Sequence, residues 1–225
     1  MTGPSNGSPP GTERLLRTAL ILSVITVVYN VAEGLFSTVF GYADDTLALF
    51  GFGVDSFVEV VSGVGIGHMV WRMLRSQVTE RDRFERQALR ITGASFYLLA
   101  VGLVAGSVLN VAYRVAPGTT VPGIIISLIS IGSMWALYSY KMKTGRALRS
   151  DPIIADANCT KTCFYLSIIL LASSVLYELL RVPYIDAIGS LGIAWFAWRE
   201  GRESMEKAES GPLSSSCDDH CSGDD

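Results

Sequence analysis

The chain has 225 residues and is apolar for a water-soluble protein, with 49% hydrophobic residues, 17% charged residues and a mean hydropathy of +0.37. This length suits one domain, and a formal net charge of −3 argues against a nucleic-acid partner. Its two histidines, His68 and His220, lie in no catalytic context, so we expect no enzyme.

Residues 1–13 are polar and rich in Gly, Pro and Ser, without a basic start before an apolar core. They do not resemble a secretory signal peptide and are expected to form a disordered tail. Residues 14–206 predict one membrane domain. Residues 207–225 predict a short acidic tail in the cytoplasm.

Six segments are apolar enough to cross a bilayer as helices, which takes about 20 residues each. They run roughly over residues 15–40, 46–71, 88–113, 122–140, 153–179 and 183–198. The predicted fold is therefore an all-α polytopic membrane protein with six transmembrane helices. We expect Asp45 to cap the second helix, and Glu178 and Asp186 to occupy ordinary positions at the outer interface.

Positive charges predict the orientation of these helices. Most of the 18 Lys and Arg residues precede the first segment, follow the sixth, or lie in the second and fourth connections. Lys141 is assigned to the fourth connection, between the fourth and fifth segments. The other side holds Arg114 and Arg181. The positive-inside rule then places both termini in the cytoplasm, and we expect a multi-pass protein of the cell (inner) membrane.

The first segment carries a polar stripe of Thr26, Asn30, Glu33 and Ser37 at helical spacing. Ionisable groups are expensive in lipid, so this stripe should face the bundle or a water-filled cavity. Asn30 and Glu33 are accessory or pathway candidates, and a role in packing alone is an equal alternative.

The second segment contains Asp55 and Glu59, which share one helix face because they are four residues apart. Such a pair could serve only as an interhelical hydrogen-bonding group. However, two like charges one turn apart in apolar surroundings are a poor packing device. We therefore favour a functional role, as ligands of a metal ion.

The fifth segment contains Cys159 and Cys163 at the same spacing. Free cysteines are often small apolar packing residues. At 1.5 Å per residue, however, they lie about 9 to 15 Å from the inner end of their helix, and the two acids lie about 13 and 19 Å from the outer end of theirs. Both pairs thus fall near the middle of a roughly 30 Å core. We predict a four-ligand site for a divalent metal.

Two further groups are weaker candidates. Asp156 lies on the same face as Cys159 and could be an extra ligand, a group at the entrance to the site, or an acid that complements the helix dipole. The tail residues Cys217, His220 and Cys221 could capture metal, or could belong to a solvated acidic tail.

Taken together, residues 12–206 resemble the cation diffusion facilitator family. The segment from Asp55 to Glu59 is similar to that family's second-span pair, and the segment from Asp156 to Cys163 is similar to its fifth-span motif, in which His and Asp are usual. The resemblance implies export of zinc-like divalent cations in exchange for protons, from a homodimer. Residues 203–225 are too short for the family's usual cytoplasmic domain, so we expect a short form.

Thiolate ligands favour soft ions, so zinc and cadmium are the expected substrates, and no permanently bound cofactor is expected. Four ionised ligands would carry more negative charge than a divalent cation neutralises. We therefore expect one ligand to stay protonated or a nearby cation to compensate. The alternatives are metal uptake through the same site, a membrane thiol oxidoreductase, and a metal-sensing accessory protein.

Overall fold

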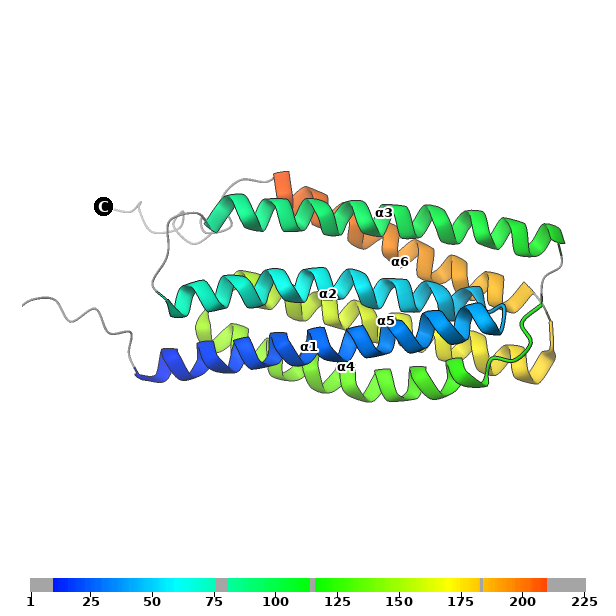
Figure 1. Ribbon diagram of the computed structural model, residues 1–225, viewed down its shortest axis with the longest axis horizontal. Helices are drawn as coiled ribbons and strands as arrows, with labels where there is room; N and C mark the ends of the chain where they lie inside the picture. Colours follow the sequence, from blue (N-terminus) through cyan, green and yellow to red (C-terminus); the bar gives the residue numbers. More distant parts are fainter. Residues whose placement is uncertain (1–9, 76–80, 114–115, 183, 210–225) are drawn as a thin grey trace, which may run out of the picture.

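The computed structural model describes residues 10–75, 81–113, 116–182 and 184–209, and within these ranges the chain forms a bundle of helices (Figure 1). The helices are α1 (Pro10–Ala43), α2 (Leu47–Leu74), α3 (Arg81–Tyr113), α4 (Val121–Leu148), α5 (Asp151–Leu180) and α6 (Tyr184–Glu209). Each helix overlaps one predicted segment. The predicted all-α fold is confirmed.

Successive helices run in opposite directions along the bundle, and the start of α1 lies at the same end as the end of α6 (Figure 1). We call this end the terminal end and the other the opposite end. The most extensive contacts join α1 to α2, α4 to α5, and α3 to α6. Figure 1 shows α3 and α6 together along one side, with the other four helices grouped beside them.

In the part of the chain that the structure describes, five helices contain a segment long and apolar enough to span a membrane: α1, α2, α3, α4 and α5. Among the described residues, α6 does not reach the same apolarity, since Asp186 lies at one end and Arg199, Glu200 and Arg202 at the other. It nevertheless packs along α3. The chain is a polytopic membrane protein.

Four helix ends lie five or more residues beyond the prediction, and two of them are the start of α3 at Arg81 and the end of α6 at Glu209. α1 begins at Pro10, inside the segment that we expected to be a disordered tail, while residues 1–9 lie outside the described residues. α4 continues beyond Tyr140 to Leu148, because the polar residues Lys141 and Thr144 are buried against the bundle rather than exposed in a connection. Only Arg149 and Ser150 separate α4 from α5.

Helix α1 is polar inside and apolar outside. Its buried residues include the predicted stripe and one further serine: Ser23, Thr26, Asn30, Glu33 and Ser37. Its exposed residues include large apolar side chains: Val24, Val28, Leu35, Phe36 and Val39. This arrangement fits a lipid environment, in which polar groups need partners inside the protein. The predicted orientation of the stripe is confirmed.

α1 and α2 approach each other closely at a glycine. A Cβ atom on Gly53 would lie 2.7 Å from the backbone nitrogen of Thr38, so only glycine fits there. Small residues at such contacts let the backbones of membrane helices pack together. Further along the same interface, the Ser23 hydroxyl donates a 2.6 Å hydrogen bond to the carbonyl of Gly63. The polar groups of α1 therefore reach α2 directly.

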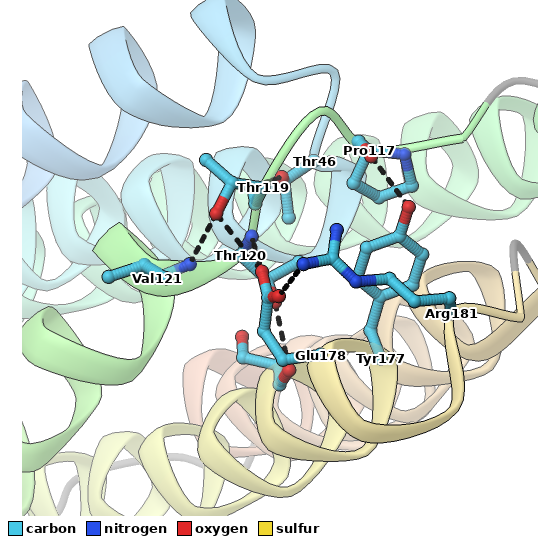
Figure 2. Close-up of polar contacts among 9 residues, drawn as sticks. Thr46, Pro117, Thr119, Thr120, Val121, Tyr177, Glu178 and Arg181 are labelled. Atoms are coloured by element: carbon cyan, nitrogen blue, oxygen red, sulfur yellow. Dashed lines mark hydrogen bonds and ion pairs between the residues drawn. The ribbon is translucent and has the colours of Figure 1, made fainter.

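At the opposite end, acidic side chains hold the starts of two helices that are remote in sequence. Glu178 of α5 accepts a 2.7 Å hydrogen bond from the Thr120 backbone N–H and a 3.0 Å bond from the Thr119 hydroxyl, at the start of α4 (Figure 2). The neighbouring Tyr177 hydroxyl donates to the carbonyl of Pro117 at 2.6 Å (Figure 2). Glu178 therefore joins the end of α5 to the start of α4, in addition to its expected position near the outer ends of the helices.

Asp186 of α6 holds the start of α2 in the same way as Glu178 holds the start of α4. Its carboxylate accepts hydrogen bonds from the backbone N–H groups of Leu47 at 2.9 Å and Ala48 at 3.2 Å. The prediction that Asp45 caps this helix was wrong. Thr46 is the N-cap and makes no side-chain capping bond, while Asp45 has a positive φ of 54° in the preceding turn.

Candidate metal centre

The centre of the bundle brings together one member of each predicted ligand pair. The Cys163 thiol of α5 donates a hydrogen bond to Asp55 of α2, with 3.0 Å between Sγ and Oδ2. Both residues are buried, and Asp55 is only 1% exposed. The second carboxylate oxygen, Asp55 Oδ1, is also buried and has no hydrogen-bond partner. An acceptor left unpaired inside a protein is costly, so this oxygen marks a place suited to a further partner.

Glu59 lies one turn from Asp55 and faces the same region. Asn30 of α1 donates a 2.8 Å hydrogen bond from Nδ2 to Glu59 Oε2. Glu59 is also within interaction range of Cys163. The amide oxygen of Asn30 is buried without a hydrogen-bond partner. Three helices thus direct a carboxylate, an amide and a thiol toward one buried place.

The four predicted ligands are not assembled around one point. Cys159 is half-buried, one turn from Cys163 toward the terminal end. Within the described ranges, no three His, Cys, Asp or Glu side chains lie close enough to hold a metal ion as they stand. Instead, Cys163 is bonded to Asp55, and Glu59 to Asn30.

Asp156 forms a buried ion pair with Lys141 of α4, with 2.8 Å between Oδ2 and Nζ. The Lys141 ammonium also donates a 3.0 Å hydrogen bond to the Thr160 hydroxyl. The two charged side chains are 2% and 5% exposed. The assignment of Lys141 to a cytoplasmic connection was therefore wrong, because its charge is satisfied inside the bundle.

Glu33 continues the polar interior toward the opposite end. It accepts hydrogen bonds from the Tyr29 hydroxyl at 2.9 Å and from the Ser56 hydroxyl at 3.1 Å. Nearby, Ser167 of α5 donates to Ser130 of α4 at 2.8 Å. The tail candidates Cys217, His220 and Cys221 lie outside the described residues.

A family model of the cation efflux transmembrane domain matches residues 19–208 of this chain. The chain belongs to the cation efflux family. No curated protein matches its sequence. The matched range includes every residue of the central polar region, from Asn30 on α1 to Cys163 on α5. The resemblance to cation diffusion facilitators is confirmed, and the protein is a metal cation transporter.

For this cation efflux protein, the donors at the centre include both carboxylate oxygens and thiol sulfur. This combination suits a borderline or soft divalent ion, whereas oxygen ligands alone would suit Mg²⁺ or Ca²⁺. Sequence reasoning predicted Asp55, Glu59 and Cys163 as metal ligands, and the structure places them near one another at the centre of the bundle. The same reasoning missed Lys141, although Lys141 lies four residues after Leu137 and therefore on the same buried face of α4.

Proposed function

We propose that this protein exports Zn²⁺ or Cd²⁺ from the cytoplasm in exchange for protons, through a site formed by Asp55, Glu59, Cys159 and Cys163. The observation that supports this most strongly is the buried contact between Cys163 and Asp55, which joins α2 to α5 and brings together one member of each predicted ligand pair. A carboxylate and a thiol placed together in lipid have few structural uses, whereas they are common ligands of zinc.

The site would close around the metal by rearranging contacts that are already local. The free oxygens of Asp55 and Asn30 border the place where Cys163 and Glu59 meet. Cys159 lies one helical turn away on the same face as Cys163, so rotation of its side chain could complete the shell. Asn30 would then be an accessory oxygen donor, and Glu33 would line the path toward the opposite end.

Proton exchange would follow from the same contact. In the hydrogen bond between Cys163 and Asp55, one proton lies between two groups that must both be deprotonated to bind metal. Metal binding would therefore release protons, and protons would displace metal. A site that holds either one and opens to one side at a time performs antiport, as midplane sites in other transporters do.

We further propose that the protein lies in the cell (inner) membrane and that its terminal end faces the cytoplasm. This end carries most of the arginines near the ends of the helices, among them Arg14, Arg17, Arg72, Arg146 and Arg199. The positive-inside rule favours that orientation. The homodimer implied by the family resemblance stays a prediction.

The test is expression in a host that lacks its own metal exporters. We expect higher tolerance to zinc or cadmium and lower metal content in the cells. An Asp55→Asn variant present in the membrane at the same level is the control and should give no protection. Unchanged tolerance and content for all divalent metals would contradict export. Uptake into inverted vesicles under an imposed pH gradient would establish the direction.

A further inference from the structure

A buried cation lies beside the proposed metal site. Lys141 extends from α4 into the bundle, where its ammonium meets Asp156 at 2.8 Å and Thr160 at 3.0 Å. A lysine near the end of a membrane helix ordinarily extends its flexible chain toward water. Lys141 instead is 2% exposed and is paired with Asp156 inside the bundle. Its charge is held inside at the expense of its hydration.

The position of this ammonium couples it to the ligands. Asp156 and Thr160 lie on α5 next to Cys159, between the terminal end and Cys163. Lys141 also interacts electrostatically with Glu59 and with Cys159. The ionisable groups that interact with Lys141 thus include its partner Asp156 and two proposed metal ligands, Glu59 of α2 and Cys159 of α5.

Structural stabilisation alone is a weak explanation for such a pair. Removing two charges from water costs free energy that their attraction often fails to repay, and apolar residues of similar volume often serve as well. A fixed positive charge beside a cation site has a direct effect, however. It opposes the incoming metal, and Asp156 reduces this opposition by neutralising part of the charge.

We propose that Lys141 is an affinity-setting residue, a resident cation that keeps metal binding weak enough for release, and that Asp156 holds it at the edge of the site. This inference rests on the proposed function. Lys141 would also be the compensating charge that a site with several anionic ligands requires.

The test is equilibrium binding of Cd²⁺ to the purified full-length protein in detergent, at one fixed pH. Lys141→Met should bind Cd²⁺ roughly tenfold more tightly, because buried charges interact strongly and are little screened. Asp156→Asn, which leaves the ammonium unneutralised, should bind roughly tenfold more weakly by the same argument. The double variant should return close to the wild-type affinity.

Transport by Lys141→Met in proteoliposomes should show a lower KM together with a lower kcat, since release becomes slow. Lys143→Met is the matched control, because it makes the same substitution two residues along α4 at an exposed position. Its affinity should equal that of the wild type. Lys141→Arg should resemble the wild type more closely than Lys141→Met does.

A purely structural ion pair would give a different pattern, with both single variants losing stability and changing affinity in the same direction or not at all. That result would overturn the inference while leaving the site intact. Wild-type protein that binds no Cd²⁺ would overturn the proposed function as well. If Lys141→Met does not fold, the recovery of affinity from Asp156→Asn to the double variant is decisive, and its absence counts against the inference.

Discussion

Two pairs of acidic residues in this bundle have opposite surroundings. Glu178 and Asp186, at the opposite end, accept hydrogen bonds from backbone N–H groups at the starts of α4 and α2. Asp55 and Glu59, in the middle of α2, meet side chains: a thiol and an amide. Asp55 also keeps one oxygen without a hydrogen-bond partner.

The difference follows from where donors exist in a helix. The first N–H groups of a helix have no partner within it, so an acid placed there finds fixed donors. In mid-helix every N–H group is already used, and an acid depends on side chains that can move. Acids such as Asp186 are thus suited to holding the structure, and acids such as Asp55 to exchanging partners.

The largest effect should come from Asp55→Asn. We expect a fall of roughly a hundredfold or more in metal affinity, because loss of a ligand should exceed the roughly 10- to 100-fold effect of losing an outer partner. Stability should change little, since one oxygen of Asp55 makes no bond. Metal-dependent proton flux and Cd²⁺ binding measure the first effect, and thermal unfolding the second. Wild-type binding by this variant would remove Asp55 from the site.

Substitutions of the two cysteines should differ in how strongly they reduce metal affinity. Cys163→Ala should lower affinity for zinc and cadmium by about tenfold or more, and Cys159→Ala by less, since Cys163 is buried and hydrogen-bonded to Asp55 whereas Cys159 is half-buried. Changing Cys159 to His and Cys163 to Asp together should move preference from cadmium toward zinc, because harder ligands replace thiolates. Metal competition in proteoliposomes checks this. If both alanine variants transport like the wild type, the cysteines serve only in packing.

Asp186→Ala should lower stability and leave metal affinity unchanged, which is the reverse of the pattern expected for Asp55→Asn. Two N–H groups at the start of α2 lose their acceptor, so we expect a loss of about 1–2 kcal/mol of stability, the usual size of a lost helix cap. Cd²⁺ affinity of the folded protein should stay at the wild-type value. Thermal unfolding and Cd²⁺ binding on the same preparation measure both. A large loss of affinity without a loss of stability would contradict the comparison.

Gly53→Ala tests how α1 presents its polar side chains to α2. The added methyl group would meet the Thr38 backbone, so we expect the Tm to fall by an amount equivalent to about 1 kcal/mol. Gly102→Ala is the matched control, because nothing lies within 4 Å of a Cβ atom there. Equal effects of the two substitutions would show that the close approach is unimportant.

The smallest effect should come from removal of residues 211–225. This acidic segment follows the last helix and contains the weak candidates Cys217, His220 and Cys221. It could at most raise the local metal concentration, so transport should be nearly unchanged in proteoliposomes. A loss comparable to that of Asp55→Asn would give the tail an essential role.

The helices and the approach of Asp55 to Cys163 could be predicted, because both follow from local properties, hydropathy and rise per residue. The partner of the α2 N-terminus could not, since Asp186 lies 138 residues from Ala48 and no local pattern links them. Lys141 was misplaced for another reason. The positive-inside argument assumes that every lysine lies in a water-exposed connection. This assumption fails where a lysine is paired with a buried carboxylate.

The ion pair between Lys141 and Asp156 also bears on how the protein enters the membrane. A lone charge in a spanning helix costs about 2.5–3.5 kcal/mol on insertion scales when it lies at the centre. Here the two charges belong to consecutive helices joined by Arg149 and Ser150 alone. The α4–α5 hairpin can therefore pair these two buried charges with each other during biosynthesis, so neither charge has to await the remaining helices for its partner.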